Sequence, residues 1–198
     1  MSIAEKLTTI AENEQKVYEA GKKSEYDAFW DMFQNKGYGA NYRYAFCYSR
    51  FDDSTFNPKY DINCTNVDSS AQYMFYSSPI TDTKVGIYAP TTNIAYCFRD
   101  SAVKTIRLLN VHESTEYSYA FTGCEDLENI TIGGTIGKAV SFSPCTKLTH
   151  DSLMSIISAL KDYSGSGTTV TLTLGSKNLA KLTDAEKQIA TGKGWTLA

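Results

Sequence analysis

The chain has 198 residues, of which 42% are hydrophobic and 13% aromatic, so it can bury one sizeable core and fits a single domain. Its formal net charge is −3, and the lysines and arginines are scattered singly, which argues against nucleic acid and anionic lipid as partners. The sequence has no charged start followed by an apolar run, and no apolar stretch approaches the ~20 residues of a membrane span. We therefore expect neither a signal peptide nor membrane insertion.

The first part of the chain, residues 3–36, is predicted to form two helices separated near Gly21. The first helix has an apolar stripe at helical spacing: Ile3, Leu7, Ile10 and Val17. The second begins near a possible N-cap at Ser24 and has a wide aromatic stripe: Tyr26, Phe29, Trp30 and Phe33. A stripe of this kind must be covered, which predicts that the segment caps the repeats that follow. The alternative is a short coiled coil between copies of residues 3–20, which would make the protein a homo-oligomer.

One short phrase then occurs five times: an aromatic anchor, a small Ser or Cys, and an apolar residue. The anchors are Phe46, Phe75, Phe98, Phe121 and Phe142, at intervals of 29, 23, 23 and 21 residues. The small residues that follow them are Ser49, Ser78, Ser101, Cys124 and Cys145. This spacing is typical of a leucine-rich-repeat-like solenoid, in which each unit adds a short strand and a return segment. The longer first interval indicates an insertion over residues 51–66, which we expect to form a loop.

Three stretches within the repeats alternate between apolar and other residues, and they predict short parallel strands at 85–87, 106–108 and 130–132. Stacked in register, these strands would share an outer face, which is where solenoid proteins usually bind. The residues expected on that face are Lys84, Gly86, Tyr88, Thr105, Arg107, Leu109, Asn129, Thr131 and Gly133.

Tyrosine is in excess, with fourteen in the chain, and four of them stand two places before an anchor phenylalanine: Tyr44, Tyr73, Tyr96 and Tyr119. We expect these four to form one column on the surface of the repeats. If exposed, the column would be a rigid amphipathic surface suited to gripping proteins or sugars. The alternative is that the rings stack on one another and cover the return segments. The candidate ligand-binding residues are Tyr44, Tyr73, Tyr96 and Tyr119, together with Lys84, Tyr88, Thr105, Arg107, Asn129 and Thr131.

After the fifth anchor the pattern changes. Helical spacing begins at a cap near Thr149 or Asp151 and is expected to continue to the Gly-Ser run at 164–167. A strongly alternating strand follows at 169–174. A capping box at 183–186 then predicts a last helix, ending at a glycine before Trp195-Thr196-Leu197.

The chain offers little for catalysis. Of its two histidines, His112 is expected in a loop between repeats and His150 beside a helix start, where we expect solvated or locally capping side chains and no ligand pair. The five cysteines are odd in number and follow the repeat, which predicts buried free thiols instead of a disulfide framework or a metal site. We therefore predict that the protein is not an enzyme and holds no cofactor or metal.

The stretch from Ala120 to Ile132 has the form Ala-Phe-x-x-Cys-x-x-Leu-x-x-Ile-x-Ile. This phrase resembles the BspA-like subclass of leucine-rich repeat proteins. The resemblance implies a bacterial surface or secreted protein that adheres to host proteins or to other cells. The N-terminal segment is also similar to the openings of repeat proteins found among prophage genes, which implies a phage particle as another setting.

The sequence thus predicts an α/β solenoid, an irregular leucine-rich-repeat-like stack of parallel short strands. Its parts would be an N-terminal helical cap at 1–37, about five repeats at 38–148, and a C-terminal α/β cap at 149–198. The predicted function is non-catalytic binding of a protein or glycan, of the adhesion type. The alternative is a structural or tail-associated component of a phage or surface assembly, oligomerising through residues 3–36. The location stays open: the cell surface or a phage particle would be reached through a partner.

Overall fold

The computed structural model describes residues 42–49, 51–56, 58, 60–64, 71–90 and 93–198, together with Glu12, Asn13, Lys16 and Gly21. These four isolated residues have helical backbone, so the break predicted near Gly21 does not fall at that residue. The rest of the segment 3–36, with the cap or coiled coil predicted for it, lies outside the described residues.

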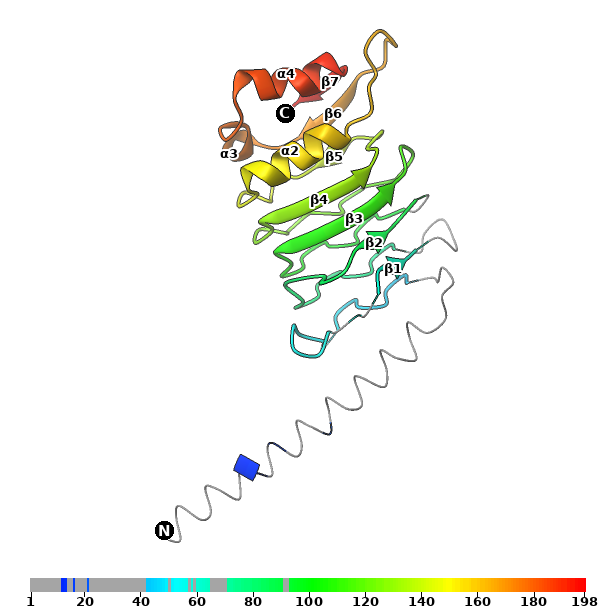
Figure 1. Cartoon of the computed structure of the whole chain (residues 1–198), viewed down its shortest axis with the longest axis vertical. Coiled ribbons are helices and arrows are strands. Elements are labelled where there is room, and N and C mark those ends of the chain that lie inside the picture. The colour runs from blue at the N-terminus through cyan, green and yellow to red at the C-terminus, as the bar shows by residue number, and fades with distance from the viewer. Residues whose placement is uncertain are drawn as a thin grey trace.

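The described chain is a mixed α/β fold with two small parallel sheets (Figure 1). The first sheet stacks four strands in chain order: β1 (Ile62–Asn63), β2 (Ile87–Tyr88), β3 (Thr105–Val111) and β4 (Asn129–Gly134). All neighbouring strands are parallel, as predicted. Along β3 and β4 the aliphatic residues alternate with exposed or half-buried ones, which is the period-two pattern that the sequence carries.

The first strand lies inside the segment for which the sequence predicts a loop, so that prediction was wrong at Ile62 and Asn63. Ile62 is buried opposite Ile87, and its N–H group donates to the Gly86 carbonyl at 2.8 Å. Two residues are too short for a recognisable alternation. The strand forms because the neighbouring repeat supplies both the hydrogen-bond partners and the apolar cover.

The second sheet orders β5 (Val140–Ser141), β6 (Val170–Thr173) and β7 (Trp195–Leu197). All its pairs are parallel, and β6 confirms the strand predicted after the glycine-rich stretch. The anchor Phe142 follows β5 directly, and its N–H group donates to the Thr173 carbonyl at 2.7 Å. The second sheet therefore lies on the same side of the stacked repeats as the anchor phenylalanines. The first sheet, β1 to β4, forms a different side.

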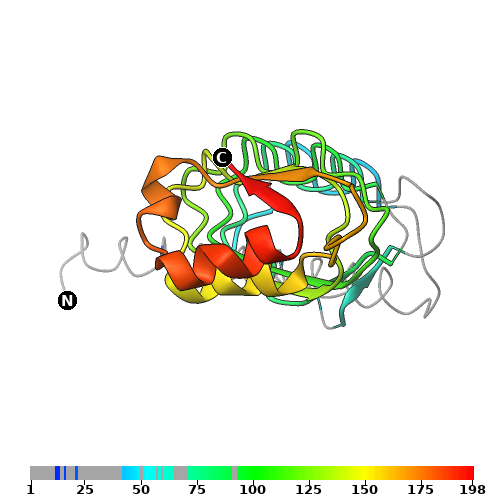
Figure 2. The same cartoon turned by 90° about the horizontal axis from the view of Figure 1, so that it is seen from above.

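Three helices belong to the last part of the chain: α2 (His150–Ala159), α3 (Ser176–Leu179) and α4 (Asp184–Gly192). Thr149 caps α2, and Thr183 with Glu186 forms the capping box of α4, as predicted. The short α3 has no side-chain cap and was not predicted. Seen from above, α4 lies along α2 at one end of the stacked turns (Figure 2).

Helix α2 ends at Ala159, well before the glycines where the sequence places its end. Leu160 takes extended backbone and forms a parallel bridge with Ile136. The ammonium group of Lys193 also lies at this end and donates to the carbonyls of Ile157, Ser158 and Leu160 at 2.9 to 3.1 Å. A lysine far away in sequence thus satisfies carbonyls that the helix leaves without partners, which no local pattern indicates.

Helix α2 also closes the edge of the first sheet. It lies along β4 where a further strand would otherwise pair (Figure 1). The backbone N–H groups of Ile130 and Ile132 donate to the hydroxyls of Ser152 and Ser155, both at 2.9 Å. Serine side chains on the helix therefore replace the acceptors of a neighbouring strand, which blocks pairing with another chain at this edge.

Replacing Ser152 with alanine is expected to lower the free energy of unfolding by about 1 to 3 kcal/mol, because it leaves the buried Ile130 N–H group without an acceptor. Chemical denaturation of the full chain would measure the effect. Ser158→Ala is the matched control, since Ser158 is exposed on the same helix and should change stability by less than about 0.5 kcal/mol. Equal stability of the two variants would mean that the hydroxyl does not cap the edge.

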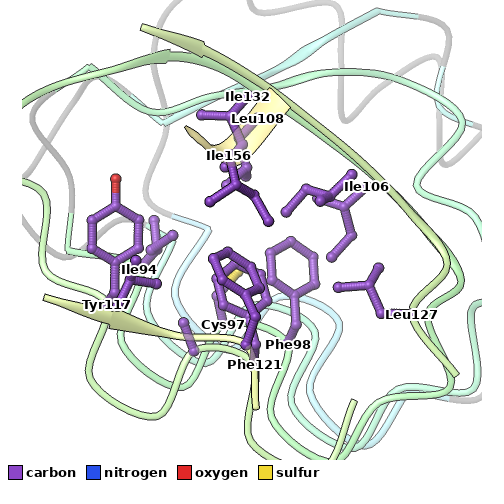
Figure 3. Close-up of a cluster of buried hydrophobic side chains, with 14 of the residues drawn as sticks. Ile94, Cys97, Phe98, Ile106, Leu108, Tyr117, Phe121, Leu127, Ile132 and Ile156 are labelled. Atoms are coloured by element: carbon purple, nitrogen blue, oxygen red, sulfur yellow. The ribbon is translucent and has the colours of Figure 1, made fainter. Parts of the chain in front are cut away.

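The five anchor phenylalanines form one continuous ladder through the core. Their rings stack at centroid distances of 5.1, 5.5, 5.8 and 4.5 Å, with interplanar angles of 4° to 27°. Figure 3 shows Phe98 and Phe121 of this ladder among aliphatic side chains such as Ile106 and Leu127, with Ile156 of α2 above them. Each repeat therefore buries its anchor against the next, since no single repeat could cover it.

The small residues after the last anchors connect adjacent repeats. The thiol of Cys124 donates to the Phe98 carbonyl at 2.9 Å, and that of Cys145 donates to the Phe121 carbonyl at 3.7 Å. Burial raises the pKa of the Cys124 thiol to about 12. This cysteine is therefore protonated at neutral pH and acts as a small hydrogen-bonding core residue, as the repeat pattern predicts.

Candidate functional site

The four tyrosines that precede the anchors form a second column parallel to the phenylalanine ladder. Tyr44, Tyr73, Tyr96 and Tyr119 stack in that order, with centroid distances of 4.8, 4.6 and 5.1 Å and interplanar angles of 4° to 24°. The predicted column is therefore present, and its rings do stack on one another. The end rings Tyr44 and Tyr119 are 50% and 59% exposed, and the two inner rings are half-buried.

Left-handed backbone puts these rings outside. Residues two apart in an extended strand point to the same side, so a buried Phe98 would draw Tyr96 inward as well. Instead, all four tyrosines have positive φ angles, between 56° and 62°. This conformation costs a bulky residue roughly 1 to 2 kcal/mol, and four successive repeats adopt it. The turn it creates separates the exposed ring from the buried one, and the sequence did not reveal it.

A backbone ladder holds the column rigid. The N–H groups of Tyr96, Phe98 and Asp100 donate to carbonyls of the next turn at 3.0, 3.0 and 2.8 Å. The same pattern joins the turns that begin at Tyr44 and Tyr73 to their neighbours. Rings fixed by backbone bonds on successive turns lose little freedom on binding, which favours their use as contact residues.

The fifth repeat ends the column. Val140 stands two places before its anchor where the earlier repeats have tyrosine, and it belongs to β5 with extended backbone. It is buried, because β6 pairs with β5 and covers this part of the chain. The outer face of the last ring, Tyr119, is therefore not covered by a fifth tyrosine.

The guanidinium group of Arg99 lies over the column. Its Cζ atom is 5.6, 5.8 and 5.9 Å from the ring centroids of Tyr96, Tyr119 and Tyr76. Its Nε atom donates to the carboxylate of Asp100 at 3.2 Å. Contacts with three tyrosine rings and an ion pair with Asp100 therefore hold this side chain beside the stacked rings. Arg99 was not predicted from the sequence, because its spacing to the tyrosines carries no signal without the left-handed turn.

Gly123 of the next repeat makes room for Asp100. A Cβ atom at Gly123 would lie 2.2 Å from the Asp100 Oδ1 atom, and Gly123 has a φ of +73°. Tyr48, Ser77 and Asp100 occupy the same slot in the earlier repeats, all with positive φ. Glycine at position 123 therefore leaves room for the Asp100 carboxylate beside Arg99.

The tyrosine surface is wider than the column. Tyr76 lies beside it, 6.0 Å from Tyr73 and 5.2 Å from Tyr48, both edge to face. Arg43 lies over Tyr44 at 5.1 Å. We use the name tyrosine face for the column together with these neighbours: Tyr44, Tyr73, Tyr96, Tyr119, Arg43, Tyr48, Tyr76 and Arg99. Tyrosine and arginine are the residues enriched at the energetic centres of protein interfaces.

Two tyrosines outside this face belong to the core. Tyr117 is buried, and its hydroxyl points away from the aliphatic cluster in Figure 3. Desolvation raises its pKa well above the usual range. Tyr42 is also buried. Tyr42 and Tyr117 each stand four places before an anchor phenylalanine, whereas the exposed column stands two places before it, so position relative to the anchor separates the two sets.

The predicted face of the first sheet is partly occupied by internal bonds. The Lys84 ammonium donates to the carbonyls of Asp53 and Phe56, and the Arg107 guanidinium donates to the Lys84 carbonyl at 2.5 Å. Leu109 lies over Gly86, where a Cβ atom would meet its side chain at 2.2 Å.

Polar side chains complete this sheet face. The Tyr88 hydroxyl accepts a hydrogen bond from Asn110 at 2.8 Å. Thr105 is half-buried, whereas Asn129 and Thr131 are exposed. The face presents scattered polar groups, and its two cations bind carbonyls of the protein itself. It is therefore less suited than the tyrosine face to hold a partner.

Each of the two histidines contacts a polar side chain in the described part of the chain. His150 lies 2.8 Å from Glu186 and joins α2 to α4, and His112 contacts Ser114 at 2.8 Å. Within residues 42–198, gaps excepted, no three His, Cys, Asp or Glu side chains gather as metal ligands. No helix in the described residues is both long and apolar enough to cross a bilayer.

Comparison with protein-family models, with curated proteins and with solved structures gives no match for this chain.

Proposed function

We propose that this protein is a non-catalytic protein-binding module, built as a capped leucine-rich-repeat-like solenoid, and that the tyrosine face contacts the partner. The solenoid interpretation is supported by the parallel strands in chain order and by the phenylalanine ladder, since both link each repeat only to its neighbours. The resemblance of residues 120–132 to BspA-like repeats supports an adhesion role.

The observation that carries the proposal is the continuous stack of four tyrosine rings on the outside of the turns. Aromatic rings on a rigid backbone supply contact area at low entropic cost, and their hydroxyls add hydrogen bonds. The left-handed backbone at Tyr44, Tyr73, Tyr96 and Tyr119 is unfavourable for such bulky residues. A repeated unfavourable conformation that exposes large rings is more readily explained by contact with a partner than by packing.

The stacking favours a protein over a glycan among the two predicted ligand classes. Sugars pack on open ring faces, but the faces of Tyr73 and Tyr96 are covered by neighbouring rings at 4.6 to 5.1 Å. Only the edges and hydroxyl groups of these two inner rings can contact a partner. A row of aromatic edges and hydroxyls beside arginine matches the composition of protein interfaces.

The alternative role, a structural or tail-associated component of an assembly, depends on self-association through residues 3–36. That segment lies outside the described residues, and the role stays a prediction.

The proposal can be tested with peptides selected from a displayed random library against the full chain. Tyr119→Ala should weaken binding of the selected peptides by about tenfold or more, which is typical of an interface hot spot. It should lower the free energy of unfolding by only about 0.5 to 1.5 kcal/mol, since Tyr119 stacks on one neighbour. Isothermal calorimetry and chemical denaturation measure the two effects.

Ile189→Ala is the matched control, because Ile189 is an exposed apolar residue on α4 outside the tyrosine face. It should leave peptide binding unchanged. Tyr73→Phe keeps the stack and removes one hydroxyl, so its effect on affinity isolates hydrogen bonding. Selected peptides whose affinity is the same for wild type, Tyr119→Ala and Tyr73→Phe would refute binding at this face.

A further inference from the structure

One cation on the tyrosine face is oriented but incompletely paired. Arg99 is held by three tyrosine rings and by Asp100, and all of these contacts involve the ring-facing side of the guanidinium or its Nε atom. Neither Nη atom donates a hydrogen bond to any residue in the described part of the chain. The side chain is 36% exposed, so this outer fork is accessible to solvent.

Several other arginines and lysines in the described chain are used differently. Lys84, Lys181 and Lys193 donate to backbone carbonyls, and Arg107 donates to the carbonyl of Lys84. Lys138 and Lys147 pair with Glu116 and Asp126. Arg99 differs from these in two ways. Its position on the exposed aromatic surface is fixed, and its two Nη atoms have no hydrogen-bond acceptor in the described part of the chain.

The charge of the surrounding surface favours an anion. The four turns that carry the column, 43–48, 72–77, 95–100 and 118–123, contain two arginines and one aspartate. They therefore have a net charge of +1, whereas the whole chain has −3. The aspartate is Asp100, which is already paired with Arg99. The formal charge of these turns is therefore more positive than that of the whole chain, which favours an acidic partner over a basic one at this surface.

We infer that Arg99 is the anchor for an acidic side chain, an aspartate or glutamate carboxylate, of the protein partner. This inference rests on the proposed function and specifies the chemistry that the tyrosine face recognises. A carboxylate accepts two parallel hydrogen bonds from the planar Nη fork, which is the preferred geometry for this pair. The rings of Tyr96 and Tyr119 lie 5.6 and 5.8 Å from the guanidinium carbon, so they shield one side of this ion pair from water, which strengthens it.

A carboxylate fits this site better than a phosphate group. A phosphomonoester carries close to two negative charges at neutral pH. At Arg99 it would meet a single cation whose charge is already shared with the Asp100 carboxylate. Sites that select phosphate usually provide several cations or a cluster of arginines. One partly neutralised guanidinium therefore matches a group with one negative charge.

The test uses peptides selected on the full chain from a displayed random library. Each selected peptide is synthesised as found, with its Asp and Glu residues changed singly to Asn and Gln, and with phosphoserine at the same positions. We expect one acidic residue whose amide form binds wild type about tenfold or more weakly, as loss of a charged hydrogen-bond pair predicts. The difference should vanish in Arg99→Gln and shrink in Arg99→Lys, which keeps the charge but lacks the fork.

Asp100→Asn supplies an independent arm, because it removes the competing carboxylate. This substitution should raise the affinity for the acidic peptide and leave the affinity for its amide form unchanged. Melting temperatures of all variants check that the fold is retained.

The possible failures are distinguishable. If selected peptides lose affinity in Tyr119→Ala but their acidic and amide forms bind equally, the carboxylate anchor is wrong and the tyrosine face stands. If the phosphoserine form binds more tightly than the acidic form and loses this gain in Arg99→Gln, the site selects phosphate and the inference is overturned. If no selected peptide responds to Tyr119→Ala or to Arg99→Gln, both the inference and the proposed function fail.

Discussion

Replacing Phe121 with alanine should lower the free energy of unfolding by about 3 to 5 kcal/mol, the usual cost of truncating a buried phenylalanine. The ring is 1% exposed and stacks on Phe98 at 5.8 Å and on Phe142 at 4.5 Å. Its loss therefore opens a cavity shared by three repeats. A loss of this size is a large fraction of the 5 to 15 kcal/mol that usually stabilises a domain.

Chemical denaturation of the full chain measures this effect. The matched control is Tyr119→Ala, two residues earlier, which removes a similar ring from the exposed column and should cost about 0.5 to 1.5 kcal/mol. The comparison separates the two parallel columns: the inner one stabilises the fold and the outer one is available for binding. A Phe121→Ala variant as stable as the wild type would contradict the stacking of the repeats.

Gly134→Ala is the second substitution with a large expected effect. Gly134 ends β4 with a φ of +105°, and a Cβ atom there would lie 2.3 Å from the Val111 carbonyl oxygen and 2.4 Å from its nitrogen. The obstacle is backbone and cannot rotate away. Strained backbone and overpacking each cost about 1 to 3 kcal/mol, so a combined loss of about 2 to 6 kcal/mol is expected.

The neighbouring residue provides the control for this prediction. A Cβ atom at Gly133 would come no closer than 3.7 Å to another atom, at the Leu108 carbonyl oxygen, and Gly133 lacks a positive φ. Gly133→Ala should therefore change the denaturation midpoint little. Both variants could instead unfold at the same denaturant concentration. That result would mean that the Val111 backbone does not prevent a side chain at residue 134.

Local signals in the sequence predicted the elements whose stability is local. Thr149 starts α2 because its side chain accepts a hydrogen bond from the Ser152 N–H group, and Thr183 starts α4 through a capping box with Glu186. In both cases the partner is three residues away. The alternating β6 strand was also identified correctly. Elements that depend on a distant partner were missed. β1 exists because β2 pairs with it, and α2 stops where Leu160 meets Ile136 and Lys193.

The candidate site divides in the same way. The repeated position before each anchor identified Tyr44, Tyr73, Tyr96 and Tyr119 as one set, and their stacking confirms the column. Arg99 was not found, because it reaches the column only across neighbouring turns. The sheet face was predicted from alternation alone, which cannot show that Lys84 and Arg107 bind carbonyls of the protein itself.

The sequence by itself determined the period of the repeat, the anchors of the core, the small residue after each anchor and the caps of the last helices. These features are encoded by residue type and spacing, because each repeat meets the next in the same way. Only the tertiary structure decided which side of the turns the tyrosines occupy, how the sheet edge is closed and that the guanidinium group of Arg99 lies beside the tyrosine column. Those outcomes depend on left-handed backbone angles and on contacts between turns, and neither is a property of a single stretch of sequence.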